Sequence, residues 1–298
     1  MTTERAITER LGAAVVARRD LSGGCCFAVT RLDLADGRQV VLKQGRSAVA
    51  GHLQIEAAML RDLAAHSPLP VPDVLDGGAD WLALAYIDHE RSGADGDAAQ
   101  AHAGRLFATL HSAAVPPALL SRDGQPPGTF GYAYDTVIGQ LPQANPPSDD
   151  WIGFFRDQRL LAMARSALAE GVLPTTTMAA IERLADRLDA FLAPPDAPAL
   201  LHGDAWGGNL LSAKGRMVGV IDPAVYIGHP EIELAFGTLF GTFGARFFAA
   251  YGEQRPIAPG FFELRRDLYN LYPLLVHVRL FGRGYLAPIE ATLRRLVG

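Results

Sequence analysis

The pattern of apolar residues changes near residue 90, and this change constrains the fold of the 298-residue chain more than any other feature. Before it, short apolar or alternating runs bounded by glycine and aspartate predict strands around a single helix. The predicted strands cover 25–32, 39–44, 71–75 and 81–87, and the predicted helix covers 52–65. From Asp97 onward, helical spacing dominates. The chain therefore predicts an α+β fold, with a small antiparallel sheet in residues 1–88 and a larger, mainly helical part in residues 89–298.

Several segments outside this division also have a clear pattern. Residues 4–18 carry apolar side chains at helical spacing and predict an N-terminal helix. Further helices are predicted at 98–111, 149–169 and 177–192 and after Pro230, and strands at 199–201, 209–212 and 217–221. Between the first two of these helices, the proline- and glycine-rich segment 115–147 predicts a long loop. Loops of that length in compact domains are usually functional.

Charge and composition exclude several classes of protein. The formal net charge is -5 and no run of basic residues occurs, so we expect no nucleic-acid partner. No stretch approaches the roughly 18 apolar residues of a membrane span, and the charged N-terminus does not resemble a signal peptide. The two cysteines, Cys25 and Cys26, are adjacent and cannot staple a fold. We therefore expect a cytoplasmic protein with no membrane partner, in a reducing compartment.

The strongest chemical signal is the segment HGDAWGGN at 202–209, followed by Asp222 at the end of a predicted hairpin. A loop aspartate, an asparagine and a second aspartate suit phosphoryl transfer, which needs positioning and charge neutralisation more than covalent help. In this interpretation Asp204 is the catalytic base that orients the acceptor hydroxyl and takes its proton. Asn209 and Asp222 hold Mg²⁺ against the phosphates of ATP, because Mg²⁺ prefers hard oxygen ligands. The alternative is a glycine-rich turn whose polar side chains only cap backbone groups.

A lysine in a predicted strand is the second signal. Only two of the 27 basic residues are lysines, Lys43 and Lys214, so a lysine kept in a strand suggests chemistry that arginine does not supply. The ammonium of Lys43 can reach nucleotide phosphates, and Glu56 in the following helix can pair with it. Gly23 and Gly24 precede the first strand, where backbone amides could approach phosphates without a side-chain clash. The alternatives are an exposed lysine, a surface glutamate and a simple turn.

These segments resemble the fructosamine kinases, within the superfamily of aminoglycoside phosphotransferases and choline kinases. The aspartate loop is shared across the superfamily. Other segments resemble the fructosamine kinases specifically, namely Pro-Gln-Ala-Asn at 142–145, Trp-Ile-Gly-Phe-Phe at 151–155 and Asp-Pro-Ala-Val-Tyr at 222–226. The resemblance extends over nearly the whole chain and also includes Gly-Gly-Cys at 23–25, Arg159-Leu160 and the segment 266–272.

The resemblance implies a bilobal, protein-kinase-like fold. Residues 1–88 would form the ATP-binding lobe, and residues 89–298 would carry the catalytic loop, the metal site and the acceptor pocket. The implied reaction transfers the γ-phosphoryl group of ATP to a sugar hydroxyl of a ketoamine, a fructosamine or ribulosamine formed by glycation. Because the phosphorylated adduct is unstable and releases the free amine, the implied role is deglycation repair.

The resemblance also indicates where adenine and the acceptor would bind. The backbone of Ala85, Tyr86 and Ile87 corresponds to an interlobe hinge that would bind adenine. Trp206 follows the proposed base by two residues and could stack on the sugar or its amine, or could instead anchor the loop in the core.

Glu231 and Glu233 open a predicted helix, where they are favoured by the helix dipole, and a cationic ketoamine would also suit them. We expect His202 to pack and to hydrogen-bond the loop backbone rather than to shuttle protons.

Two other functions stay open from the sequence. One is a kinase of another small alcohol, such as an aminoglycoside or a choline-like molecule, and the other is a non-catalytic nucleotide-binding module. Protein-kinase activity is not expected, because the chain has no DFG or APE motif. The sequence also leaves open which ketoamine is used, which hydroxyl is phosphorylated, and whether the protein is a monomer or a homodimer. Cys25 and Cys26 are either redox-sensitive thiols in the phosphate loop or small core-facing residues.

Overall fold

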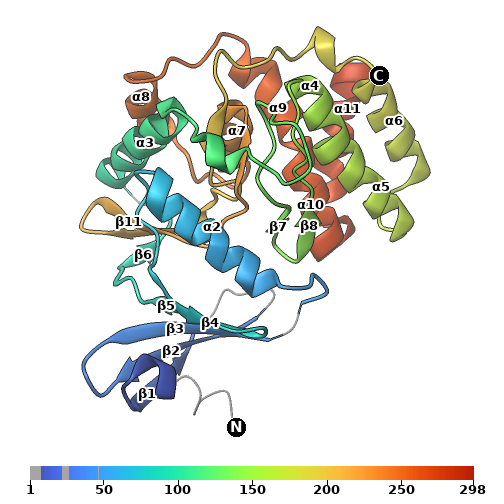
Figure 1. Ribbon diagram of the computed structural model, residues 1–298. Coiled ribbons are helices and arrows are strands. Elements are labelled where there is room, and N and C mark those ends of the chain that lie inside the picture. Colours follow the sequence, from blue (N-terminus) through green and yellow to red (C-terminus); the bar gives the residue numbers. More distant parts are fainter. Residues whose placement is uncertain (1–7, 22–26, 46, 95) are drawn as a thin grey trace.

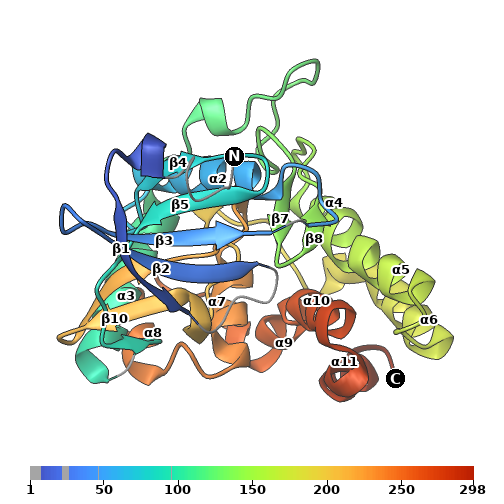
Figure 2. The ribbon, with the colours of Figure 1, turned by 90° about the horizontal axis from the view of Figure 1, so that it is seen from below.

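The structure, a computed structural model, describes residues 8–21, 27–45, 47–94 and 96–298. These residues form a small lobe built on an antiparallel sheet and a larger, mostly helical lobe, which confirms the predicted α+β class (Figure 1). The sheet has the strand order β1-β2-β3-β5-β4, and each strand is antiparallel to its neighbour (Figure 2). Its strands are β1 (Val15–Asp20), β2 (Ala28–Leu34), β3 (Gln39–Gln44), β4 (Val74–Gly77) and β5 (Trp81–Ala85).

Helix α2 (His52–His66) joins the two lobes through two apolar faces. Leu53 and Leu60 pack against Leu82 of β5, on the side of the sheet. Met59 and Leu63 belong instead to the core of the larger lobe. Because both faces are buried, the helix is fixed relative to both lobes, and a side chain that it points between them is held in place.

The N-terminal segment contains a strand where a helix was expected. The prediction of a helix over 4–18 is wrong for its second half, because β1 begins at Val15. A helical turn is described at 8–11, and Gly12 ends it with a φ of 71°, a conformation that favours glycine. Val15 and Val16 are β-branched and favour the strand that follows. The apolar residues on both sides of Gly12 happened to have helical spacing, so the prediction merged the helical turn with the strand β1.

The larger lobe packs its helices around one contiguous apolar core (Figure 1). Its α-helices are α3 (Asp97–Ser112), α4 (Trp151–Phe154), α5 (Ala162–Ala169), α6 (Thr175–Ala185), α7 (Pro230–Leu239), α8 (Ala245–Gly252), α9 (Arg266–Tyr269), α10 (Leu271–Phe281) and α11 (Leu286–Val297). Shorter 3₁₀ turns lie at Pro117–Leu119, Leu188–Ala190, Gly207–Asn209 and Arg283–Tyr285, and π-helical turns at Phe155–Leu161 and Phe261–Arg265. The predicted helices at 98–111, 149–169 and 177–192 correspond to α3, to the continuous run from α4 to α5, and to α6 with its following 3₁₀ turn. Among the described residues, no helix is long and apolar enough to cross a membrane.

Short strands frame the loops that leave this core. β9 (Ala199–Leu201) pairs with β12 (Tyr226–Gly228), and β10 (Leu210–Ala213) pairs with β11 (Arg216–Val220). β6 (Arg91–Ser92) adds to β10. The strands predicted around position 200 are therefore confirmed, and they bring the two aspartate segments of the sequence side by side.

The segment 115–147 is not the structureless loop that its composition predicts. It contains the hairpin of β7 (Thr136–Ile138) and β8 (Leu141–Gln143). Gly139, the first residue of the turn, has a φ of 55°, and the favoured two-residue hairpin turns require a positive φ at that position. The hairpin escaped prediction because each strand is only three residues long and carries polar side chains that are buried.

Candidate active site

A buried lysine lies between two carboxylates at the junction of the lobes. Side chains alternate between the two faces of β3. Val40 and Leu42 pack in the apolar cluster on the face that is turned away from α2, and Lys43 points toward α2. The Nζ atom of Lys43 lies 2.6 Å from Oε1 of Glu56 and also contacts Oδ1 of Asp222. Burial by itself would lower the pKa of Lys43, but the two carboxylates outweigh that effect and raise its pKa. The ammonium is therefore held in its charged form, in the pairing with Glu56 that the sequence predicts.

Asp222 has a backbone conformation that residues other than glycine rarely adopt. Its φ is 53°, in the left-handed region. Such a conformation costs on the order of 1–3 kcal/mol, although aspartate tolerates it better than most residues do. Just before it, the amide of Ile221 donates to the carbonyl of Asn209 at 2.9 Å. The chain then turns and directs the carboxylate of Asp222 toward Lys43.

Asn209 links the two aspartates of the site. Its side-chain amide donates to the carboxylate Oδ2 and to the backbone carbonyl of Asp204, each at 2.9 Å, and more distantly to the carbonyl of Asp222 at 3.4 Å. Because the amide nitrogen faces Asp204, the side-chain carbonyl of Asn209 is the group that could face a cation. Gly203, with a φ of 84°, lets the loop pack on the carbonyl of Ala224, where a side chain would collide. Asp204, Asn209 and Asp222 are thus connected by hydrogen bonds, as one group.

Glu233, in the first turn of α7, anchors this loop, a role that the sequence did not predict. Its buried carboxylate accepts hydrogen bonds from the backbone amides of Gly203 (2.6 Å) and His202 (3.3 Å). It also accepts one from Nε2 of His111 at 2.9 Å, and Nδ1 of His111 lies 2.9 Å from the hydroxyl of Tyr251. The sequence did contain a signal for this role, because Glu233 lies on a helix that is apolar on all sides. Such a helix is buried, and a buried charge needs several partners.

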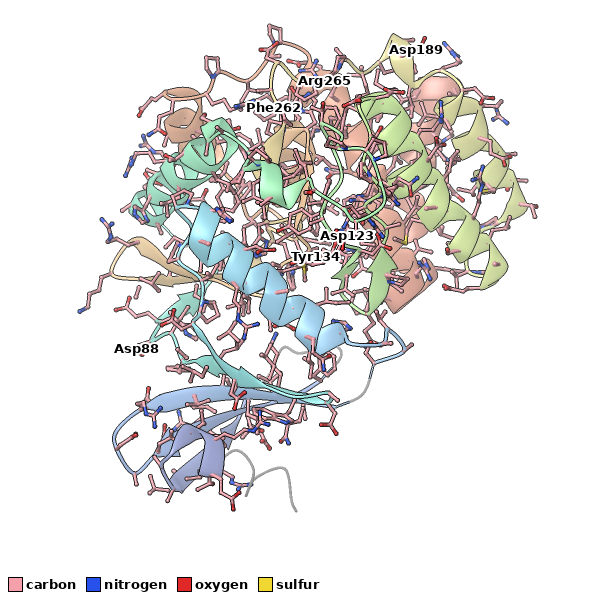
Figure 3. The ribbon with its side chains drawn as sticks, viewed as in Figure 1. Asp88, Asp123, Tyr134, Asp189, Phe262 and Arg265 are labelled. Atoms are coloured by element: carbon pink, nitrogen blue, oxygen red, sulfur yellow. The ribbon has the colours of Figure 1, made fainter. Side chains whose placement is uncertain are left out.

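The expectation that Glu231 and Glu233 suit a cationic substrate is wrong. Neither residue lines the cavity beside Asp204. Glu231 instead accepts two hydrogen bonds from Arg265, each of 2.7 Å. Figure 3 places Arg265 at the end of the larger lobe that is remote from the sheet. Both acids therefore organise the interior of the larger lobe.

His202 holds the loop backbone in the way that the sequence predicts. Its Nδ1 accepts a hydrogen bond from the amide of Asp204 at 3.3 Å. The ring is buried, and this burial lowers the pKa of His202. The residue is therefore a neutral acceptor for the loop rather than a proton shuttle.

A cavity of about 410 Å³ lies beside these groups. Its polar wall is formed by Lys43, Glu56, Asp204, Asn209 and Asp222. The rest of the wall is mostly apolar and aromatic and includes Val137, Ile138, Trp206, Phe236, His277 and Phe281. Trp206 is 37% exposed and packs edge-to-face on Phe240, with ring centroids 6.0 Å apart. A chain of charged and hydrogen-bonding groups thus meets an aromatic surface that can receive an organic molecule.

Comparison with known proteins decides the family. The sequence profile described as fructosamine kinase matches residues 1–298, the whole chain. The chain belongs to the fructosamine kinase family. A Synechocystis protein named as a probable ketoamine kinase is 33% identical over 288 residues, which cover 93% of this chain and 89% of that protein.

Solved structures confirm the fold of this fructosamine kinase family member. A crystal structure from Thermobifida fusca, assigned as a fructosamine-3-kinase, has a TM-score of 0.84 and 31% identity and covers 99% of this chain and 98% of its own. An aminoglycoside phosphotransferase, APH(4)-Ia in complex with ADP and hygromycin B, has a TM-score of 0.67 and 17% identity, and the match covers both chains fully. At that identity the likeness concerns the fold alone. The predicted bilobal, kinase-like fold is therefore confirmed.

The segment predicted to bind adenine in this kinase uses two of its amides within the sheet. The amide of Ala85 donates to the carbonyl of Asp73 at 2.9 Å, and the amide of Tyr86 donates to the carbonyl of Gln39 at 3.0 Å. These two amides therefore already have partners, and the binding of adenine by backbone groups of residues 85–87 stays a prediction. The carbonyl of Ile87 lies 2.9 Å from Nδ1 of His89.

Four residues of the predicted phosphate loop lie outside the described residues. They are Gly23, Gly24, Cys25 and Cys26. Phe27, the first residue described after them, lines the cavity. The approach of the glycine amides to phosphate and the redox sensitivity of the thiols stay predictions.

Replacing Lys43 separates its role in the fold from its role in the reaction. Lys43→Met is expected to lower the free energy of unfolding by about 3 kcal/mol, because it leaves Glu56 buried without its cation. The double variant Lys43→Met/Glu56→Gln should recover most of this stability, since glutamine is neutral, and should stay inactive, since no ammonium can reach the phosphates. Urea unfolding and ATP turnover, measured on both variants, separate the two effects. Recovery of activity together with stability in the double variant would mean that Lys43 serves only the fold.

Proposed function

We propose that the protein transfers the γ-phosphoryl group of ATP to a sugar hydroxyl of a ketoamine, a fructosamine or a ribulosamine. The observation that carries this proposal is the meeting of Lys43, Asp204, Asn209 and Asp222 around one cavity whose remaining wall is aromatic. Membership of the fructosamine kinase family implies the use of ATP, and the Synechocystis relative is named as a ketoamine kinase. The charged groups match the demands of phosphoryl transfer, which depends on positioning and on neutralising the phosphates.

In the proposed reaction Asp204 is the catalytic base. Its carboxylate accepts the hydrogen bond of the acceptor hydroxyl and takes the proton as the oxygen attacks the γ-phosphorus. The bond between that phosphorus and the β–γ bridging oxygen breaks, and ADP leaves. Asn209 orients the base, because its side-chain amide donates to Oδ2 of Asp204 at 2.9 Å.

The donor set fits a magnesium ion held between protein and phosphates. The carboxylate of Asp222 and the side-chain carbonyl of Asn209 are hard oxygen ligands, and Mg²⁺ in kinases is held by one or two such groups together with phosphates and water. Within the described part of the chain, no cluster of three or more His, Cys, Asp or Glu side chains could hold a metal ion. Bound Mg²⁺ would neutralise charge on the phosphates. Glu56 would then keep Lys43 in place to bind the phosphates when Asp222 serves the ion.

The aromatic wall suits the sugar and the amine of a ketoamine. The faces of Trp206 and Phe281 can contact a sugar ring, and a cationic amine is attracted to aromatic faces. Nδ1 of His277 donates to the carbonyl of Pro273 at 2.7 Å, which leaves Nε2 as an acceptor in the neutral ring. Burial lowers the pKa of His277 and favours that neutral form. A sugar hydroxyl is therefore a suitable partner for His277.

The wider biological context is also proposed. A phosphorylated ketoamine is unstable and releases the free amine, so the role would be deglycation repair in the cytoplasm. Residues 1–88 would form the nucleotide-binding lobe and residues 89–298 the lobe for metal and acceptor. The protein would work as a monomer or a homodimer on a small-molecule or protein-linked ketoamine.

One assay tests this function. ATP consumption is measured side by side with ribuloselysine, fructoselysine, erythruloselysine and an aminoglycoside as acceptors. We expect the ketoamines to stimulate ADP formation and the aminoglycoside to leave it at the level without acceptor. Stimulation by the aminoglycoside alone would overturn the ketoamine proposal in favour of another small-alcohol kinase. No turnover with any acceptor would favour a non-catalytic nucleotide-binding module.

A further inference from the structure

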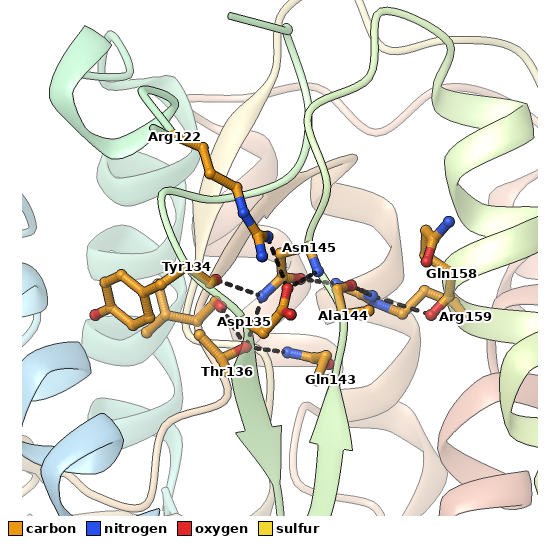
Figure 4. A network of polar contacts seen from close by, with 10 residues as sticks. Arg122, Tyr134, Asp135, Thr136, Gln143, Ala144, Asn145, Gln158 and Arg159 are labelled. Atoms are coloured by element: carbon orange, nitrogen blue, oxygen red, sulfur yellow. Dashed lines mark hydrogen bonds and ion pairs between the residues drawn. The ribbon is translucent and has the colours of Figure 1, made fainter. Parts of the chain in front are cut away.

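The hairpin β7–β8 and the residues just after it carry three buried polar side chains, which form part of a network of polar contacts (Figure 4). The exposed fractions are 1% for Thr136, 2% for Gln143 and 0% for Asn145. Burying neutral polar groups is costly unless each one has hydrogen-bond partners. The hairpin therefore keeps these side chains for a reason other than apolar packing.

The hydroxyl of Thr136 is the centre of this network and is used to its full capacity. It accepts hydrogen bonds from Nε2 of Gln143 at 2.9 Å and from Nδ2 of Asn145 at 2.8 Å. It donates its own hydrogen to the carbonyl of Val225 at 3.1 Å. One donor and two acceptor positions are all that a hydroxyl offers. Thr136 thereby connects the two strands of the hairpin to the segment that follows Asp222.

Gln143 makes a second connection to that segment. Its Nε2 also donates to the carbonyl of Ala224 at 3.0 Å, and its Oε1 accepts from the hydroxyl of Tyr272 at 2.6 Å. The carbonyl of Ala224 is the group against which Gly203 of the catalytic loop packs, and the amide of Ala224 donates to the carbonyl of His202 at 2.8 Å. The same short segment is thus held from one side by the hairpin and from the other by the loop that carries the base.

Arg159 holds the end of the hairpin to the catalytic strands. Its buried guanidinium donates to Oδ1 of Asn145 at 2.6 Å and to the carbonyl of Ala144 at 2.8 Å (Figure 4). It also lies over the ring of Tyr226, 4.0 Å from its centroid. Tyr226 pairs with Leu201, the residue that precedes the catalytic loop. Arg159 projects from a π-helical turn, a feature that is frequent at functional sites.

The residues that follow Thr136 form part of the cavity wall. Val137, Ile138 and Gly139 line the cavity, and Gly139 packs against Leu280 of α10, the helix that also contributes His277 and Phe281 to the wall. We infer that Thr136 is a positioning residue that fixes the acceptor wall of the cavity relative to the catalytic loop and the metal-binding segment. This inference deepens the proposed function, because it rests on the cavity holding the acceptor. Its consequence is that loss of the hydroxyl affects the acceptor and spares ATP.

The test removes the hydroxyl while keeping the shape of the side chain. Thr136→Val removes one hydrogen bond each from the carbonyl of Val225 and from the side-chain amides of Gln143 and Asn145. We expect kcat/KM for the acceptor to fall about 100-fold, because small misplacements of a substrate have large effects on rate. The KM for ATP and any formation of ADP without acceptor should be unchanged, and Thr136→Ser, which keeps the hydroxyl, should retain acceptor turnover.

A matched control removes another buried threonine hydroxyl. Thr177 of α6 is 5% exposed and donates to Oε1 of Glu290 at 3.2 Å, in a helix that does not line the cavity. Thr177→Val should leave both KM values unchanged. If it causes the same loss as Thr136→Val, or if Thr136→Val raises the KM for ATP as much as that for the acceptor, the network is only structural and the inference is wrong.

Two choices keep the test decisive. If Thr136→Val does not fold, Tyr272→Phe removes one hydrogen bond at the rim of the network, and we expect a loss in the same direction of about fivefold, the worth of a single hydrogen bond. No effect of Tyr272→Phe on the acceptor would then count against the inference. All variants are assayed with whichever acceptor the unsubstituted enzyme uses best. A failure of the ketoamine proposal is therefore seen in the unsubstituted enzyme, and a failure of the positioning inference is seen in the variants.

Discussion

Replacing Asp204 by asparagine is expected to lower kcat by about 10²- to 10⁴-fold, the usual contribution of a positioned acid–base group. Asparagine has the same shape as aspartate and can still accept the hydrogen bond from Nδ2 of Asn209 through its side-chain oxygen. It cannot take the proton of the acceptor hydroxyl. The amide of residue 204 would still donate to His202, so the loop should keep its conformation.

The binding of nucleotide separates this loss from misfolding. In the proposed mechanism Asp204 contacts the acceptor and not the nucleotide, so calorimetric titration with Mg-ADP should give the same Kd for Asp204→Asn and for the unsubstituted enzyme. Circular dichroism and the melting temperature should also be unchanged. Turnover near that of the unsubstituted enzyme, in a variant that passes these controls, would remove Asp204 from the mechanism.

Asp222→Asn is expected to reduce kcat/KM for Mg-ATP on the order of 10³-fold. It would remove a full negative charge from the proposed magnesium site, and a metal's stabilisation of the transferring phosphoryl group is worth several kcal/mol. Asparagine is a sharper choice than alanine, because asparagine also tolerates the left-handed backbone that Asp222 adopts at a φ of 53°. Strain is therefore not added to the loss of charge.

Asn209→Ala provides the comparison for the metal site. Asn209 would offer Mg²⁺ a neutral carbonyl, so its loss should reduce activity less than the loss of Asp222 does. Titration of each variant with Mg²⁺ at fixed ATP reports the affinity for the metal. Activity of Asp222→Asn that persists at ordinary Mg²⁺ concentrations would place the metal elsewhere.

The local part of the site could be predicted from the sequence. Asp204 and Asn209 lie five residues apart in one loop, and Lys43 and Glu56 lie thirteen residues apart on adjacent elements, so patterns of neighbouring residues were sufficient. The strands predicted around position 200 are also close in sequence, so they were sufficient to place Asp222 beside the loop that carries Asp204.

The parts that escaped prediction depend on contacts between distant segments. Glu233 holds the amide of Gly203 across 30 positions of the chain, and His111 meets Glu233 across 122. Two partners of the β7–β8 hairpin, Val225 and Ala224, lie more than 80 positions away. No local pattern records such partners, and a short polar hairpin in a proline-rich segment therefore has the composition of a loop.

The backbone of residues 85–87, which was predicted to bind adenine, also depends on a contact that the sequence does not show. An apolar run over 81–87 correctly indicated β5, yet the pairing of Tyr86 with Gln39 decided which amides stay available. A strand's side chains can be read from the sequence, whereas the partners of its backbone are set by the neighbouring strand.

The most direct measurement is phosphorus NMR of the reaction of the protein with Mg-ATP and the ketoamine that it uses best. The predicted result is a new phosphomonoester resonance that grows in step with ADP, shows coupling to a sugar proton, and is not detected over the same time with Asp204→Asn. Formation of ADP with inorganic phosphate alone, and of no ester with any ketoamine or other alcohol offered, would contradict the assignment of the cavity as a site of phosphoryl transfer to a sugar hydroxyl.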